Sequence, residues 1–167
     1  YAPHTERAYS DVDYMILGLI VEQVVGKRLD EYLQEGVYRR LGLERTGFRP
    51  LDIRTPPDLI AATELNGNTR DGNVGFGTRP DGSPVFIRTQ TIRGQVQDEK
   101  AFYTMSGVSG HAGLFSTADD LGVLLQLMSN EGMYQGREYF PADVQRRFLT
   151  PDGDSATYGL GWRTNGY

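Results

Sequence analysis

Residues 10–26 limit most strongly what this chain can fold into. Ser10 can begin a helix, because its hydroxyl can accept a hydrogen bond from a free backbone N–H, and Gly26 can end one. Between them, apolar residues follow helical spacing and also fill most of the opposite side. The sequence therefore predicts a helix that is buried nearly all round and needs neighbours to cover it.

Other local signals predict three further helices. Apolar residues at helical spacing predict a second helix over about 29–41. Ser116 and Thr117 are candidate caps, and the two acids that follow suit the first turn of a helix. Pro141 fits the first turn of a short helix over 142–149.

Strands are expected to be few and short. β-branched and aromatic residues predict strands over 59–65 and 85–92, and residues 158–162 indicate the start of another. Proline, glycine and asparagine are frequent between 49 and 100, which predicts a loop-rich insertion there. We expect residues 1–167 to form a single partial domain.

Composition and charge exclude several classes of function. The net charge is −5, from 17 Lys and Arg against 22 Asp and Glu, whereas nucleic-acid binding needs a basic face. The longest apolar run, 14–20, is shorter than the roughly 20 residues of a membrane span. The chain has no cysteine, and its histidines and carboxylates show no metal-ligand spacing. We therefore expect no metal, no cofactor and no nucleic acid.

Three segments carry a family resemblance. The first is Tyr9-Ser10-Asp11 with the helix that follows, continuing through Arg40-Leu41-Gly42-Leu43 to Phe48. The second runs from Gly107 to Leu121 and includes Gly113-Leu114-Phe115-Ser116-Thr117-Ala118-Asp119-Asp120-Leu121. The third is Tyr158-Gly159-Leu160-Gly161-Trp162. In order and approximate spacing they resemble the class C β-lactamase and D-alanyl-D-alanine carboxypeptidase family of penicillin-binding-protein-like serine hydrolases.

The resemblance implies a fold class that is mostly α with a few short strands, the helical lobe of a β-lactamase/transpeptidase-like α/β fold. It also implies acyl-enzyme chemistry, in which the serine of an S-x-x-K motif attacks a carbonyl while the lysine and a motif tyrosine move its proton. A later K-T-G-like strand completes the substrate groove. The expected substrate is a peptidoglycan peptide or a β-lactam, and the expected location is the periplasm or cell envelope.

The nucleophile is expected outside this chain. No serine here is followed three residues later by lysine, and neither Lys27 nor Lys100 begins a K-T-G. The resemblance places S-x-x-K before Tyr1, so we expect an internal fragment that is inactive alone. His111-Ala112-Gly113 matches the H-x-G variant of K-T-G only formally.

Three residues are candidates for the site. The resemblance makes Tyr9 the proton-transfer tyrosine, although without the lysine it is expected to behave as an ordinary phenol. Asp11 stands where many relatives carry Asn; an ionised carboxylate only accepts hydrogen bonds, whereas an amide also donates. Asp11 could equally be a helix-start acid favoured by the helix dipole. His111 either lines the groove or satisfies a loop carbonyl, and Ser10 is interpreted as a cap.

Two alternatives to a D-Ala-D-Ala carboxypeptidase remain open. Asp11 lends weight to an esterase or amidase on the same scaffold, and a non-catalytic, cell-wall-binding relative is the other possibility. Because the helix over 10–26 is apolar on nearly every side, we expect a marginal monomer or self-association through exposed apolar surface. The remainder of its own fold is the other expected partner.

Overall fold

The computed structural model describes residues 5, 9–68, 80–151 and 157–163. The chain divides into two compact units, residues 1–116 and 117–167. The prediction of one partial domain stays a prediction. Within the described residues, no helix combines the length and the apolar character needed to cross a membrane.

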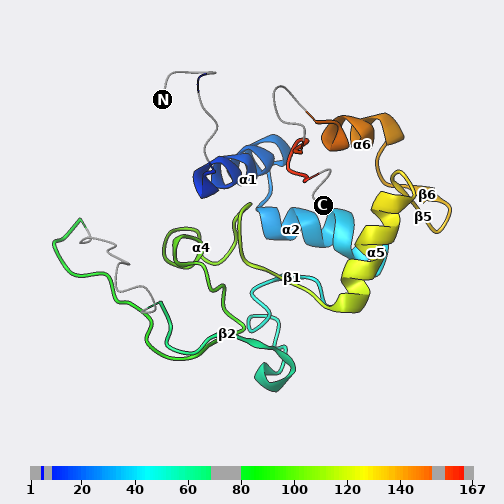
Figure 1. Cartoon of the computed structure of the whole chain (residues 1–167). Coiled ribbons are helices and arrows are strands. Elements are labelled where there is room, and N and C mark those ends of the chain that lie inside the picture. Colours follow the sequence, from blue (N-terminus) through cyan, green and yellow to red (C-terminus); the bar gives the residue numbers. More distant parts are fainter. Residues whose placement is uncertain (1–4, 6–8, 69–79, 152–156, 164–167) are drawn as a thin grey trace. The chain divides into compact units, whose positions relative to one another are not determined.

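The regular secondary structure of the first unit is mainly helical, with long loops between the elements (Figure 1). The helices are α1 (Asp11–Val25), α2 (Leu29–Leu33), η1 (Gln34–Tyr38), α3 (Arg39–Leu41), η2 (Pro57–Leu59) and α4 (Glu99–Thr104). The predicted cap of α1 is confirmed, because Ser10 is extended and its Oγ accepts a 3.2 Å bond from the N–H of Val12. Gly26 ends α1 with φ 66°, as predicted. α2, η1 and α3 follow one another without a break and confirm the second helix, with a π-helical turn at its centre.

The prediction that α1 is buried nearly all round is wrong for this chain. Its one buried residue is Gly18. Seven of its larger apolar or aromatic side chains are at least 40% exposed: Val12, Tyr14, Ile16, Leu17, Leu19, Ile20 and Val24. The apolar pattern is present as expected, but the described residues leave most of it uncovered.

Four two- or three-residue strands form two antiparallel pairs in the first unit. They are β1 (Gly47–Phe48), β2 (Ala62–Glu64), β3 (Ile92–Arg93) and β4 (Leu114–Phe115). β1 pairs with β4, and β2 lies beside β3 (Figure 1). The strand predicted over 59–65 is confirmed only at β2, and of the strand predicted over 85–92 only Ile92 is paired. Part of the expected insertion, 69–79, lies outside the described residues.

The core of the first unit is small. Its buried apolar residues come from the α2–α3 helix, β3 and the segments around α4: Leu29, Tyr38, Leu41, Leu43, Ile92, Val96, Ala101 and Val108. α2 is joined to α1 by the side chain of Glu22, whose Oε1 accepts a 2.8 Å bond from the N–H of Leu29. This bond fixes the turn that follows α1.

The second unit contains two helices and a hairpin. They are α5 (Ala118–Ser129), β5 (Met133–Tyr134), β6 (Arg137–Glu138) and α6 (Ala142–Leu149). Both helices were predicted, and the Oγ of Thr117 caps α5 by accepting a bond from the N–H of Asp120. The strand predicted over 158–162 is wrong: the segment turns back on itself and forms an isolated bridge between Tyr158 and Arg163.

Candidate active site

The tyrosine motif lies at the beginning of α1. Because Ser10 is extended and caps the helix, the residues on either side of it, Tyr9 and Asp11, can both present their side chains at this end. The hydroxyl of Tyr9 hydrogen-bonds the carboxylate of Asp11. Tyr9 is 91% exposed, so its hydroxyl can be reached from solvent. The structure thus brings two of the predicted site residues together.

The electrostatics of this pair correct one expectation. The hydrogen bond to Asp11, followed by the negative charge of that carboxylate, raises the pKa of Tyr9 above the ordinary value. The positive charge of Lys100 acts in the opposite direction. Tyr9 is therefore held more firmly protonated than the ordinary phenol that the sequence predicts.

Lys100 reaches this motif from α4. Its Nζ lies 2.7 Å from Oδ2 of Asp11, although the two residues are 89 positions apart in the sequence. The hydrogen bond from Lys100, together with that from Tyr9, lowers the pKa of Asp11, and the bond between Lys100 and Asp11 also raises the pKa of Lys100. Asp11 is consequently an ionised acceptor held between two donors.

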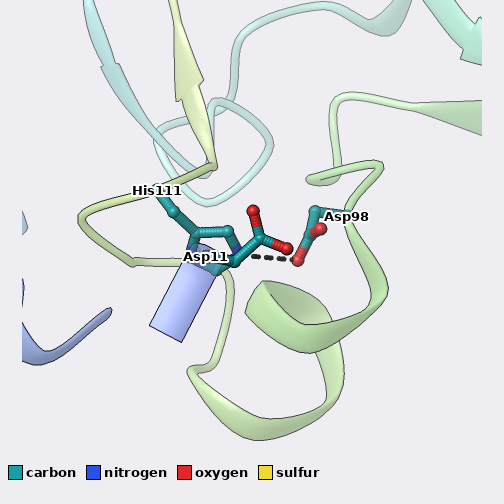
Figure 2. Close-up of side chains that lie close together, drawn as sticks. All are labelled: Asp11, Asp98 and His111. Atoms are coloured by element: carbon teal, nitrogen blue, oxygen red, sulfur yellow. Dashed lines mark hydrogen bonds and ion pairs between the residues drawn. The ribbon is translucent and has the colours of Figure 1, made fainter. Parts of the chain in front are cut away.

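The segment 107–113 carries His111 to the same place. The segment can pack closely against α1 because residue 110 is glycine. A Cβ there would overlap the backbone carbonyl of Tyr14 and lie 3.2 Å from the N of Gly18. Backbone therefore packs directly on backbone where this segment crosses α1. Figure 2 shows the result, with Asp11, Asp98 and His111 converging on one point.

His111 is held by a hydrogen bond on each ring nitrogen. Its Nε2 lies 2.9 Å from Oδ1 of Asp98, and its Nδ1 lies 2.7 Å from Oγ of Ser109. An ionised Asp98 can only accept, so we assign the ring proton to Nε2, and Ser109 then donates to Nδ1. Asp98 also caps α4 by accepting a 2.7 Å bond from the N–H of Ala101. This arrangement fixes the ring relative to α4.

Ser109, His111 and Asp98 are the residue types of a serine-hydrolase triad, but the geometry does not suit that role. Ser109 is only 4% exposed, so a substrate carbonyl has no access to its hydroxyl. The His111 side chain is likewise 5% exposed. We interpret the three residues as a hydrogen-bonded support for the motif.

The same cluster is the one place in the described part of the chain where ligand atoms gather as at a metal site. One atom each from Asp11, Asp98 and His111 lie within 4.8 Å of one another. Sequence spacing could not show this, because the three residues come from distant segments. Their atoms already have partners, however, since Nε2 bonds Asp98 and the Lys100 ammonium neutralises Asp11. A cation would have to displace that ammonium, so no metal chemistry is assigned here.

Sequence reasoning missed Asp98, Lys100 and Ser109 as members of the site. The signal for α4 was present, because Asp98 precedes a short helical stretch and is a good cap. No signal of that kind joins Lys100 to Asp11, because the contact is made only by the folded chain.

Comparison with known proteins decides the family. The model of the Beta-lactamase family matches residues 1–167. The chain belongs to the beta-lactamase family. A relative from Escherichia coli (strain K12), named "Putative D-alanyl-D-alanine carboxypeptidase", is 54% identical over 166 residues, covering 99% of this chain and 36% of the relative.

Solved structures show the beta-lactamase family fold. A penicillin-binding protein from Bacillus halodurans matches with a TM-score of 0.59 at 21% identity, covering 96% of this chain and 41% of that protein. A D-amino acid amidase from Ochrobactrum anthropi matches with a TM-score of 0.55 at 18% identity, covering 89% and 36%. The family resemblance and the mostly helical fold class, a lobe of this larger fold, are confirmed. The chain spans 36% of the length of its Escherichia coli relative.

Proposed function

We propose that this chain is the tyrosine-bearing part of a serine-type D-Ala-D-Ala carboxypeptidase that acts on peptidoglycan peptides in the periplasm or cell envelope. The observation that carries the proposal is the 54% identity, over nearly the whole chain, to the Escherichia coli relative whose name contains that activity. The exposed hydroxyl of Tyr9 beside Lys100 and Asp11 supports it, because such a group can pass a proton.

The proposed chemistry is acyl transfer. A serine of the longer protein attacks the peptide carbonyl, its Oγ–C bond forms, and the C–N bond to the terminal D-alanine breaks. The serine proton passes by way of a lysine and Tyr9 to the departing amine, and water later hydrolyses the ester. In this scheme the chain supplies Tyr9 and its surroundings but no nucleophile, and is inactive alone.

A hydrolase for esters or simple amides on the same fold is the second candidate. The observation that favours it is Asp11, whose ionised carboxylate is held by Lys100 and offers no donor to a substrate. Release of alcohol from a simple ester, with no release of D-alanine from a peptide ending in D-Ala-D-Ala, would favour this candidate over the carboxypeptidase.

Exposing this chain and the longer protein to a penicillin, and then measuring intact masses, tests the proposal. We expect an adduct on the longer protein only, on a serine before Tyr9. Tyr9→Phe in that protein should slow acylation by about 10²- to 10⁴-fold, the usual contribution of a positioned proton-transfer group. The control is Tyr32→Phe, a change on α2 away from the motif. This variant should be acylated at the same rate as the unchanged protein.

Other outcomes would overturn parts of the proposal. An adduct on this chain would show that the nucleophile has been misplaced. No adduct on either protein, together with no hydrolysis of peptide or ester, would support the third interpretation, a non-catalytic cell-wall-binding relative. Equal rates for Tyr9→Phe and the unchanged protein would remove Tyr9 from the mechanism.

We also propose that the rest of the longer protein covers the apolar face of α1. Alone, the chain is then expected to self-associate, with a sedimentation coefficient that rises with concentration. Ile16→Lys and Ile20→Lys should reduce that rise, because both side chains are about half exposed on α1. Ile53→Lys, at a more exposed site outside α1, is the control and should leave the rise of the sedimentation coefficient unchanged. A stable monomer at all concentrations would contradict the proposal.

A further inference from the structure

Lys100 is poorly explained as a surface ion pair that stabilises the fold. Exposed pairs of this kind contribute little, because solvent screens them and ordering the side chains costs entropy. Asp11 also has less need of a counter-charge than most carboxylates, because it lies in the first turn of α1, where the helix dipole already favours a negative charge. The position of Lys100 beside Tyr9 therefore calls for another reason.

The donors and acceptors at this point are unevenly distributed. Asp11 accepts from both Tyr9 and Lys100, and an ionised carboxylate has nothing to donate. A lysine ammonium carries three N–H groups, and in the described part of the chain the partner found for this one is Asp11. The Lys100 side chain is 45% exposed, and its charge acts on Tyr9, so solvent can reach the ammonium near the tyrosine.

We propose that Lys100 is a substrate-binding residue whose free N–H groups bind a carbonyl oxygen of a peptide-like substrate next to Tyr9. Asp11 holds the ammonium in place, so the two side chains together accept and donate as a single amide would. The inference rests on the proposed function, because it assigns a substrate contact to the same site.

The surrounding charges favour a neutral carbonyl over a carboxylate as the bound group. Asp98 and Glu99 both lie near enough to Lys100 to raise its pKa, after the stronger effects of Asp11. The charges of three carboxylates thus act on one ammonium. An anionic group would be repelled by this excess of negative charge, whereas a carbonyl oxygen needs only a directed donor.

A set of variants of the longer protein tests the inference. We expect Lys100→Met to lower kcat/KM for D-alanine release from a peptide ending in D-Ala-D-Ala by about 10- to 100-fold, the range for losing a hydrogen bond from a charged donor. Asp11→Asn/Lys100→Met should recover several-fold over Lys100→Met, because the Asn amide supplies the missing donor. Lys100→Arg should retain more activity than Lys100→Met, because guanidinium also donates.

A second measurement, on this chain, separates binding from misfolding. Carboxyl ¹³C titration should show the pKa of Asp11 rising in Lys100→Met, because the ammonium that lowers it is gone, while the remaining backbone signals keep their positions. Widespread signal changes in Lys100→Met would attribute its slow rate to a disturbed fold and overturn the inference.

The remaining outcomes distinguish the inference from the function on which it rests. Suppose that the unchanged longer protein is acylated and releases D-alanine, but Lys100→Met has the same kcat/KM. Only the inference about Lys100 is then contradicted. The same holds if the double variant is no better than Lys100→Met. If the unchanged protein neither acylates nor hydrolyses, the proposed function fails, and the inference falls with it.

Discussion

Gly110→Ala is expected to push the segment 107–113 away from α1 and to destabilise the first unit by about 3 kcal/mol, the upper end of the usual cost of overpacking. The added methyl group would overlap the carbonyl oxygen of Tyr14, and it would also lie 3.2 Å from the backbone N of Gly18. Neither neighbour can move as a side chain could, because both contacts are with backbone. The cost therefore includes a shift of either the segment or the helix.

The same change should disturb the candidate site. His111 follows Gly110 directly, and its ring is fixed by bonds to Asp98 and Ser109. Urea unfolding measures the stability, and the ring ¹⁵N signals of His111 report its surroundings. We expect these signals to shift, because the displaced segment cannot keep both bonds.

Gly122→Ala is the matched control for Gly110→Ala. Gly122 lies within α5, and a Cβ added there meets nothing within 4 Å. Alanine should therefore stabilise that helix, by roughly 0.5–1 kcal/mol, through its higher helix propensity. A Gly110→Ala variant that unfolds at the same urea concentration as the unchanged chain would show that the packing of this segment on α1 is loose.

The elements that could be predicted are those whose signals are local. Ser10 and Gly26 mark the ends of α1, and Thr117 marks the beginning of α5, because capping depends on residues within a turn of the helix end. The family motifs likewise placed Tyr9 and Asp11 at the candidate site. Local chemistry thus located most of the helices, whereas the family resemblance pointed to Tyr9 and Asp11.

What could not be predicted depends on residues far apart in the sequence. The exposure of α1 depends on which surfaces are present to cover it, which its own apolar pattern cannot reveal. The contact between Lys100 and Asp11 joins two helices 89 residues apart. The hydrogen-bonded pair Asp98–His111 also needs the fold, because each residue alone has an ordinary structural explanation.

The failed strand over 85–92 has a specific physical cause in Arg88. This side chain is 2% exposed, although arginine is rarely buried without a carboxylate partner. The backbone N–H of Arg88 donates to the phenol oxygen of Tyr103 at 2.7 Å, rather than to a neighbouring strand. The backbone conformation of this segment is therefore set by the contacts of one buried guanidinium group rather than by its β-propensity.

Arg88→Met is expected to destabilise the first unit by roughly 2–6 kcal/mol, because each buried acceptor that loses its donor costs about 1–3 kcal/mol. The guanidinium donates to Oδ1 of Asn68 at 2.9 Å, to the carbonyl of Val96 at 2.9 Å and to that of Gln97 at 3.1 Å. It also stacks on the ring of Phe102, with 3.6 Å between its central carbon and the ring centroid. Methionine would fill much of the volume but would leave buried acceptors without donors.

Arg88→Lys tests whether charge alone is sufficient. A lysine ammonium is a compact point charge, so it cannot reach three acceptors arranged around a planar fork or stack on Phe102 in the same way. We therefore expect Arg88→Lys to recover only a small part of the stability lost in Arg88→Met. Urea unfolding, followed by the signals of residues around Asn68 and Val96, measures both variants.

Arg93→Met is the matched control, because Arg93 also donates to backbone carbonyls, those of Pro57 and Ile60, but does so at an exposed position. Water can replace those bonds, so the expected cost is within about 1 kcal/mol. Similar losses in Arg88→Met and Arg93→Met would mean that burial adds nothing to the Arg88 network. A larger loss in Arg88→Met alone would show that burial of this guanidinium group, rather than strand pairing, stabilises the segment 85–92.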